Sequence, residues 1–427
     1  MLVTLLGMTT SSERSATGAS HTGALGGIRV LDLSRVLAGP ACAQLLGDLG
    51  ADVIKVERPG VGDDTRQWGP PWLVDAAGEP TSESSYYLSA NRGKRSVTID
   101  IGTDEGVAVV RALAAKSDVV IENFKVGSLA KKGLDYEGLR EVNAAIVYAS
   151  ITGFGQDGPM ANQPGYDYLA QAMGGLMSIT GRRDDEPGGG PMRAGVAVAD
   201  QAAGMYATVA VLAALRHRDQ TGVGQHIDVS LLDSQVSFLA NQALNYFVGG
   251  TPPTRSGEWH PNLAPYQPFD VADGRVIVAV GNDGQFASFC QWLDLDELVH
   301  DPRFVTNPDR NRHRVELAGL LQEKLRTRTK AQALAALPEL GVPAATVNDI
   351  AEAFDEPQVR HRGGRIELPH PLAGTAPAVA NPIHFSESPI TYRNAPPLLG
   401  EHTNEVLAEV LGLNESEIAT LHNNHVI

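Results

Sequence analysis

Along the first third of the chain, short apolar runs alternate with longer segments in which apolar residues recur every three to four positions. The short runs have the length and composition of β-strands and lie at 28–34, 51–57, 94–101, 118–123 and 144–155. The longer segments, 39–50 and 104–117, have the period of helices. Strands that alternate with helices predict a parallel sheet with helices on its faces. The pattern therefore indicates an α/β fold.

The pattern changes twice further along the chain. A long helical region is predicted from Asp200 onward, and a Gly- and Pro-rich break follows it at 249–265. The strand-like run 275–281 and the polar helix 312–328 then indicate a smaller second domain. We expect a disordered leader, a large domain, a linker with a small domain, and a C-terminal segment that returns to the large domain, with the boundaries 1–25, 26–245, 246–368 and 369–427.

Composition narrows the class of protein. The 427 residues include 50 acids against 34 Lys and Arg, a formal charge of −16, which argues against nucleic acid or an anionic membrane as the main partner. The apolar run 196–215 is too interrupted to cross a bilayer. The start, whether Met1 or Met8, lacks the basic region of a signal peptide. Since Cys42 and Cys290 are the only cysteines and no CxxC motif occurs, we expect a cytoplasmic protein.

Several familiar catalytic motifs are missing from the sequence. The first strand–helix turn reads LAGPACAQ (37–44) and lacks the G-x-G-x-x-G of dinucleotide-binding folds. There is also no G-x-x-x-x-G-K-[ST], no G-x-S-x-G and no H-E-x-x-H. His422 and His425 have no third ligand near them in sequence, so we expect no metal site. Hydride transfer, phosphoryl transfer and serine hydrolysis thus lack their usual signatures.

Three loops that carry glycine and basic residues stand next to predicted strands. They are ERPGVGDDTR (57–66), NRGKR (91–95) and ENFKVGSLAKKG (122–133). Open α/β sheets bind ligands in loops at the ends of their strands. Each loop alone is typical of a solvated turn, whereas together they are suited to a ligand with several phosphates.

Asp200 is the only charged residue in the apolar run 196–215. An isolated carboxylate is costly to bury, so such a residue is usually a helix cap, a paired group or a reactive group. Asp is a favoured N-cap and the helical run begins right after it, which favours the cap. Both the cap and the reactive group remain open at this point.

Five stretches of the chain, taken together, resemble the class III CoA-transferases, the family of formyl-CoA transferase and carnitine CoA-transferase. They are VLDLSRVLAGPACAQLLGDLGADVIKVERPG (30–60), DVVIENFKVG (118–127), GYD (165–167), VADQAAGMYA (198–207) and LLGEHTNEVL (398–407). The resemblance implies a Rossmann-like large domain that binds CoA, a smaller α+β domain, and an interlocked homodimer of two ring-shaped chains. It also implies acyl-CoA and carboxylic acid substrates and no tightly bound cofactor.

By this resemblance Asp200 is the catalytic nucleophile, which forms an anhydride with the acyl group and then a thioester with CoA. An aspartate with the ordinary pKa of about 3.9 is ionised at neutral pH, and covalent catalysis divides one difficult exchange into easier steps. The family's CoA contacts correspond to Leu37, Ala38, Arg58, Ile99, Asp100, Ile101, Gly102, Asn123, Phe124, Lys125, Lys131, Pro164, Gly165, Tyr166 and Asp167.

Departures from formyl-CoA transferase bear on the substrate. Leu37 stands where that enzyme has Gln, Lys131 stands where it has Arg, and HPNLAPYQPF (260–269) replaces its tetraglycine lid. WGPP (68–71) and SITGFGQDGP (150–159) are closer to the succinyl-CoA–glutarate branch. We therefore expect a dicarboxylate such as succinate or glutarate rather than formyl-CoA and oxalate. The candidate cations for a second carboxylate are Arg92, Arg95, Arg193 and His260.

Two other functions remain open. The α-methylacyl-CoA racemases of the same superfamily retain the aspartate but need a His where this chain has Tyr166. Because the ordinary pKa of Tyr is about 10, it is poorly suited to exchange a proton at neutral pH. A non-enzymatic CoA-binding protein is the third possibility, and the retained Asp200 argues against it.

Overall fold

The computed structural model describes residues 23–427, so most of the predicted leader, with Met1 and Met8, lies outside the described residues. The chain divides into two compact units. The first consists of Met1–Leu176, Gly195–Ala240 and Arg360–Ile427, and the second consists of Met177–Ala194 and Asn241–Val359. Each unit has a hydrophobic core of its own.

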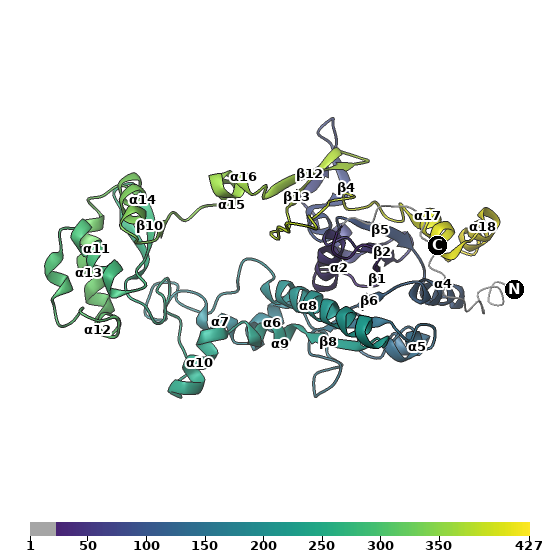
Figure 1. Cartoon of the computed structure of the whole chain (residues 1–427), viewed down its shortest axis with the longest axis horizontal. Coiled ribbons are helices and arrows are strands. Elements are labelled where there is room, and N and C mark those ends of the chain that lie inside the picture. The colour runs from purple at the N-terminus through teal and green to yellow at the C-terminus, as the bar shows by residue number, and fades with distance from the viewer. Residues whose placement is uncertain (1–22) are drawn as a thin grey trace. The chain divides into compact units, whose positions relative to one another are not determined.

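A six-stranded parallel sheet forms the centre of the first unit (Figure 1). In spatial order its strands are β5 (Lys94–Thr98), β2 (Asp52–Glu57), β1 (Arg29–Asp32), β6 (Val119–Glu122), β7 (Val147–Thr152) and β8 (His226–Ser230). All neighbouring pairs are parallel. The predicted α/β fold with a parallel sheet is therefore confirmed. Because the strand order reverses beside β1, the sheet has a topological switch point between β1 and β6.

Helices cover both faces of this sheet (Figure 1). On one face, α2 (Ala38–Asp48) and α8 (Val198–Thr221) pack over Val, Ile and Ala side chains of the strands. On the other face, α4 (Asp104–Ala115), α17 (Thr403–Leu411) and α18 (Glu415–Asn423) bury Leu, Val and Ile side chains. The last two helices of the chain thus complete the core of the first unit.

Helix α8 lies at the centre of the first core. By length and composition it is the one helix among the described residues that meets the requirements of a membrane span, contrary to the sequence-based expectation. Half of its most apolar window is buried within the protein, as in the core helix of a globular unit. Small residues bring it close to α2, because a Cβ atom at Gly204 would lie 2.8 Å from the carbonyl oxygen of Ala38.

Short elements complete the first unit. They are β3 (Trp72–Val74), β4 (Pro80–Ser84), α3 (Ser85–Leu88), α5 (Tyr136–Arg140), α6 (Asp167–Met173), α9 (Leu231–Ser237), β12 (Arg365–His370), β13 (Gly374–Val379) and the 3₁₀ turns Asp64–Gln67 and Ala130–Lys132. The pairs β3–β4 and β12–β13 are antiparallel. Three helices, α7 (Leu176–Ile179), α10 (Ala240–Gly249) and α16 (Pro357–His361), run across the boundaries between the two units.

The second unit is built on a three-stranded antiparallel sheet. Its elements are β9 (Tyr266–Val271), β10 (Gly274–Ala279), β11 (Ala344–Ala345), α11 (Asp283–Trp292), α12 (Asn307–Arg312), α13 (Arg314–Leu325), α14 (Lys330–Glu339), α15 (Ile350–Asp355) and the 3₁₀ turn Asp296–Val299. The spacing of Leu317, Leu321 and Leu325 places one face of α13 in the core of this unit.

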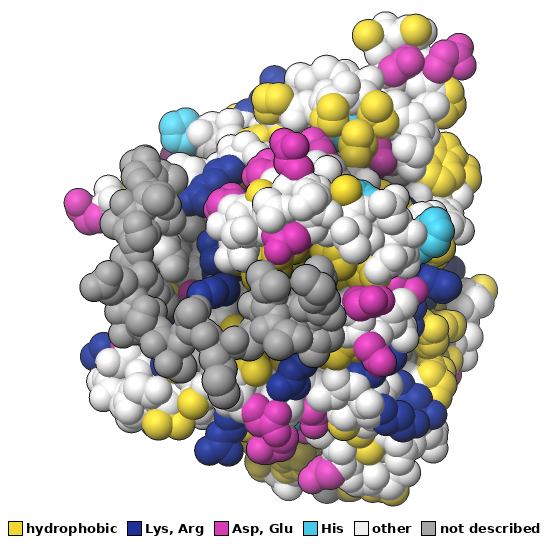
Figure 2. All heavy atoms as spheres, turned by 90° about the vertical axis from the view of Figure 1, so that its right-hand side faces the viewer, with side chains coloured by type: hydrophobic (Ala, Val, Ile, Leu, Met, Phe, Trp, Pro, Cys, Tyr) yellow, Lys and Arg dark blue, Asp and Glu magenta, His cyan; other side chains and the backbone are white. Residues whose placement is uncertain are grey.

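Charged side chains are mixed on the face of the molecule that Figure 2 shows. Lys and Arg lie among Asp and Glu rather than gathering into one basic surface. A nucleic acid requires such a basic surface for its phosphates. This face and the net charge of −16 thus both disfavour a nucleic acid partner.

Candidate active site

A pocket of about 520 Å³, here called the Asp200 pocket, lies at the carboxyl ends of the central strands. Segments that follow β1, β6, β7 and β8 form most of its wall. The complete set of lining residues is 35–38, 123–126, 151–153, 161–166, Asp64, Trp68, Asp200 and Leu231. The segments after β1 and β6 meet at the switch point, where open α/β sheets usually bind their ligands.

The pocket brings together nine of the residues that the sequence assigned to a site. They are Leu37, Ala38, Asn123, Phe124, Lys125, Pro164, Gly165, Tyr166 and Asp200. Arg58 and residues 99–102 do not line it, although they directly follow β2 and β5 at the same edge of the sheet. Lys131 lies on the 3₁₀ turn Ala130–Lys132 beyond the loop that follows β6, also outside the lining.

Of the two roles left open for Asp200, the structure excludes the helix N-cap. Helix α8 begins at Val198 and its N-cap is Ala197, whose side chain cannot cap. The capping acceptor comes from another element: Asp167 Oδ1 accepts hydrogen bonds from the backbone N–H groups of Ala199, at 2.8 Å, and Asp200, at 3.4 Å. The side chain of Asp200 is therefore released from capping, and Asp167 caps α8 instead of lining the pocket.

The Asp200 carboxyl group has an unusual electrostatic environment. Among the described residues, no hydrogen-bond donor reaches its oxygens. Burial raises its pKa to about 7, and the negative charge of Asp167 contributes to the increase. The expectation that an ordinary low pKa keeps Asp200 ionised is thus wrong. At neutral pH this carboxyl group instead titrates, as tuned catalytic carboxyl groups do.

Two aromatic side chains that sequence reasoning did not assign lie close to Asp200. Trp68 lines the pocket and packs edge-on against Tyr86, with ring centroids 4.9 Å apart. Burial raises the pKa of Tyr86, and the nearby charges of Asp200 and Asp167 raise it further. Arg35 was also missed, although its place directly after β1 could have indicated it. With Lys125, Arg35 is one of two basic side chains on the wall of the pocket.

Two of the predicted cations for a second carboxylate are used elsewhere. Arg92 is buried and pairs with Asp48, at 2.6 Å, on the last turn of α2. Arg95 pairs with Asp52, at 2.7 Å, at the start of β2. Neither lines the Asp200 pocket, so the structure does not support either of them as a partner of the substrate. Arg193 and His260, the other two candidates, belong to the second unit.

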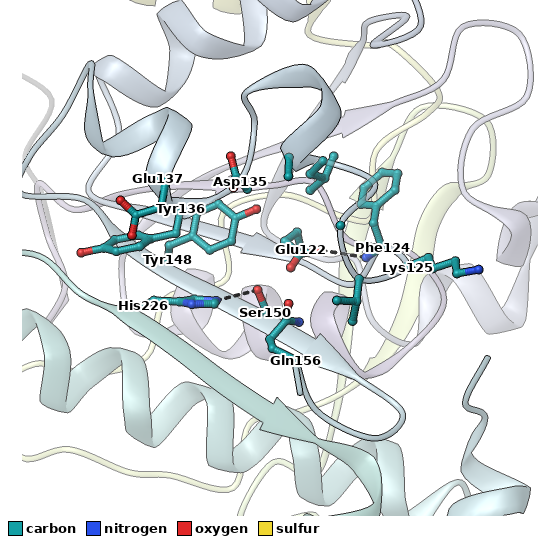
Figure 3. Close-up of a pocket in the computed structure, with 14 residues that line it drawn as sticks. Glu122, Phe124, Lys125, Asp135, Tyr136, Glu137, Tyr148, Ser150, Gln156 and His226 are labelled. Carbon is teal, nitrogen blue, oxygen red and sulfur yellow. Dashed lines mark hydrogen bonds between the residues drawn. The ribbon is translucent and has the colours of Figure 1, made fainter. Parts of the chain in front are cut away.

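A second pocket of about 270 Å³, the Glu122 pocket, shares Phe124, Lys125 and Val126 with the first (Figure 3). Burial raises the pKa of Glu122 as well. Its carboxylate, however, accepts a hydrogen bond from the backbone N–H of Phe124 at 2.8 Å, and Ser150 beside it bonds to His226 at 2.9 Å (Figure 3). Glu122 is held by its surroundings, so a raised pKa alone does not distinguish a reactive carboxyl group.

Comparisons with known proteins identify the family of this chain. The family model of CoA-transferase family III matches residues 25–403. The chain belongs to this family. This family III CoA-transferase is 50% identical over 386 residues to the succinate–glutarate CoA-transferase of Agrobacterium fabrum, with 90% of this chain and 95% of that protein covered.

Two further relatives of this family III CoA-transferase extend the comparison. The succinyl-CoA:glutarate CoA-transferase of Mus musculus is 43% identical over 397 residues, with 93% of this chain and 88% of that protein covered. The crystal structure of a CAIB/BAIF family protein from Brucella suis matches with a TM-score of 0.80 at 46% identity, and covers 91% of this chain and 100% of that chain. The family resemblance read from the sequence motifs is thereby confirmed.

Proposed function

We propose that this enzyme transfers CoA from a dicarboxylic acyl-CoA, such as succinyl-CoA, to a second dicarboxylate, such as glutarate, through covalent intermediates on Asp200. The observation that carries the proposal is the carboxyl group of Asp200, which lines the pocket and accepts no hydrogen bond from the described residues. A nucleophile needs such a free carboxylate, because a donor bound to it would hold the electron pair that attacks.

The proposed exchange has four steps. A carboxylate oxygen of Asp200 attacks the thioester carbonyl, the C–S bond breaks, and an acyl–aspartyl anhydride and CoA thiolate form. The thiolate attacks the aspartyl carbonyl carbon, which releases the donor acid and leaves an aspartyl-CoA thioester. The acceptor carboxylate attacks this thioester and expels CoA thiolate, giving a second anhydride. The thiolate then attacks the acceptor's carbonyl, which yields the new acyl-CoA and free Asp200.

The start of α2 is suited to the negative charge that develops in these steps. Its N-cap, Leu37, provides no side-chain acceptor for the N–H groups of the first helical turn. Leu37 and Ala38 both line the Asp200 pocket. Free N–H groups at a helix N-terminus bind anions and stabilise an oxyanion.

Trapping with hydroxylamine tests the nucleophile. After incubation with succinyl-CoA, hydroxylamine converts an aspartyl thioester or anhydride into a hydroxamate, which mass spectrometry locates on one peptide. We expect the modification on Asp200 in the wild type and none in Asp200→Asn. Labelling of another carboxylate, or continued transfer by the variant, would refute the assignment.

The proposed substrate class rests on Leu37 and on the names of the relatives. The succinate–glutarate enzyme of Agrobacterium fabrum acts on dicarboxylates, and Leu37 presents an apolar side chain to the pocket. In succinate and glutarate two or three methylene groups separate the second carboxylate from the reacting one, whereas the two carboxylates of oxalate are bonded directly to each other. Arg35, which pairs with the exposed Asp64 at 3.0 Å on the same wall, is a basic group that can exchange this partner for the distant carboxylate. We expect turnover with glutarate to exceed turnover with oxalate by at least about tenfold, which is the effect of one good contact between the enzyme and the second carboxylate. Equal turnover would remove the basis for this specificity.

We also propose that the protein is a homodimer, interlocked as the family resemblance implies. Met205, Tyr206 and Val209 on α8 are exposed, with 55%, 43% and 64% of their surface accessible, and Phe238 at the end of α9 packs edge-on against Tyr206. A second copy that covers this apolar face would explain its exposure. Mixing tagged and untagged protein tests the interlocking, because rapid subunit exchange under native conditions would contradict it.

A cytoplasmic location is part of the same proposal. Cys42 and Cys290 are both free and buried, as thiols are in a reducing compartment. Cell fractionation with an antibody against the protein measures the location directly, and recovery outside the cytoplasm would overturn it.

The racemase alternative is less well supported by this site. Tyr166, at the position where a racemase needs His, lines the pocket and is 63% exposed. Racemisation requires a second base on the other face of the α-carbon, and a phenol is less suited to that role than the imidazole of His. Exchange of the α-hydrogen of 2-methylacyl-CoA in deuterated water would revive this alternative.

A further inference from the structure

The loop between β1 and α2 contains a residue in a strained conformation. Val36 has a φ angle of 72°, in the left-handed region that glycine normally occupies. A β-branched side chain is especially unfavourable there, because its Cβ substituents crowd the backbone. Strain of this kind persists only where surrounding contacts enforce it. Val36 lines the Asp200 pocket and directly precedes Leu37 and Ala38, which line it too.

The contact that enforces the conformation comes from Asp63. Both carboxylate oxygens of Asp63 accept a hydrogen bond from the backbone N–H of Val36, at 3.1 and 3.2 Å. The same carboxylate accepts bonds from the backbone N–H and the hydroxyl of Thr65, at 3.0 and 2.8 Å. Thr65 therefore also holds Asp63 in place, as a rigid anchor requires.

A fully buried lysine completes the anchor. The Lys55 ammonium donates to Asp63 Oδ2 at 2.9 Å and to the carbonyl oxygen of Ser34 at 2.8 Å, and the side chains of Lys55 and Asp63 are both inaccessible to solvent. Lys55 thus joins Asp63 to the loop two residues before Val36. Asn123, from the segment after β6, also binds this loop: its side-chain oxygen accepts a bond from the backbone N–H of Arg35 at 2.9 Å, and its side-chain nitrogen donates to the carbonyl oxygen of Arg35 at 2.6 Å.

We propose that the Lys55–Asp63 ion pair is a positioning device for the transferase reaction: it holds Val36 in its left-handed conformation and so fixes the start of α2 against the reacting carbonyl. Neither side chain lines the pocket, so both act through the backbone of Val36. This inference rests on the proposed role of the Asp200 pocket. Small displacements of groups that orient a reacting centre reduce rates strongly, which is why a buried, rigid anchor is suited to this place.

Three variants test the device by steady-state kinetics with succinyl-CoA and glutarate. Asp63→Asn weakens the anchor, because it removes the charge that Lys55 holds. Val36→Gly removes the strain instead, because glycine adopts the left-handed conformation freely. We expect Asp63→Asn to lower kcat/KM by about tenfold or more and Val36→Gly to stay close to the wild type. Asp48→Asn is the matched control, because it breaks another buried ion pair, with Arg92, on the last turn of α2 and away from the pocket. It should lower the melting temperature and leave kcat/KM unchanged.

The double variant separates positioning from general destabilisation. If Asp63 acts through Val36, adding Val36→Gly to Asp63→Asn restores part of the lost kcat/KM, because glycine adopts the left-handed conformation without the anchor. Lys55→Gln, which removes the other partner of the ion pair, takes the place of Asp63→Asn if that variant does not fold. The inference is overturned if the anchor variant stays within about twofold of the wild type, or if Val36→Gly restores none of its loss, while wild-type Asp200 is still trapped as its hydroxamate. Failure of that trapping would instead overturn the proposed function.

Discussion

Two aspartates beside the same pocket, Asp63 and Asp200, have opposite environments. Burial acts to raise the pKa of both side chains. At Asp63 the charge of Lys55 and the bonds from Thr65 outweigh burial and bring the pKa down to about 2. At Asp200 no cation or donor from residues 23–427 compensates, Asp167 adds a like charge, and the pKa rises to about 7. The neighbouring charges and hydrogen-bond donors, and not the extent of burial, thus decide which carboxylate is inert and which can react.

The difference also separates two tasks that an active site needs. Asp63 is tied to Lys55, Thr65 and Val36, so it fixes geometry at the expense of its own reactivity. Asp200 is tied through its backbone N–H to Asp167, while its carboxyl group remains free. An environment that pushes the pKa values of two carboxyl groups apart marks their different roles.

The largest expected effect comes from removing the reactive member of the pair. Asp200→Asn keeps the shape of the side chain but cannot form an anhydride, so kcat should fall by about 10³-fold or more. The loops after β1 and β6, which the family resemblance assigns to CoA, are unchanged, so binding of CoA should persist. Steady-state kinetics and isothermal titration with CoA measure the two quantities. Near-normal turnover by the variant would show that Asp200, like Asp63, forms no covalent bond to the substrate.

The sheet could be predicted from the sequence because local pattern determines it. Each apolar run between glycine- or proline-containing turns became a strand, as at β1, β2, β5, β6 and β7. Their burial on both faces produces continuous runs of Val and Ile, which is the signature of a parallel sheet. The position of the pocket then followed, because loops after neighbouring parallel strands meet at one edge.

The partners of the charged residues could not be predicted in this way. NRGKR appeared to be a ligand-binding cluster, yet Arg92, Lys94 and Arg95 pair with Asp48, Asp32 and Asp52. The cap on α8 is a contact between residues 32 positions apart, from Asp167 to Ala199. Such contacts depend on how elements pack, and a single sequence contains no local signal for them.

A smaller expected effect tests why Asp200 titrates near neutral pH. Asp167→Asn removes the negative charge but keeps an acceptor for Ala199, since Asn caps helices about as well as Asp. The carboxylate of Asp200 is the reactive form, so kcat/KM of the wild type should fall as pH drops below about 7. In the variant this acid limb should move to lower pH by up to about one unit. An unmoved limb in the pH profile would mean that burial alone sets the pKa.

Asp167→Ala is the companion variant. This variant removes the charge and the capping acceptor together. The acid limb of its pH profile should therefore move as in Asp167→Asn. Its melting temperature should also fall, because the loss of a helix cap costs about 1 kcal/mol in folding free energy. Equal melting temperatures of the two variants would show that the cap contributes nothing to α8.

A further expected effect concerns stability and separates the two aspartates by sign. The folded-state pKa of Asp200 lies above its ordinary value of 3.8, so the folded protein binds the extra proton and loses stability as pH rises from about 4 to about 7. At Asp63 the folded-state pKa is lowered to about 2, so its contribution is present above about pH 4 and is lost as pH falls towards 2. Asp200→Asn should therefore be more stable than the wild type at pH 8, by up to about 4 kcal/mol, because each unit of pKa corresponds to about 1.4 kcal/mol. Near pH 4 the two proteins should melt together. Thermal unfolding followed by circular dichroism across this pH range measures the difference in stability. If the variant is more stable by the same amount at every pH, the gain comes from packing and not from removal of the buried charge.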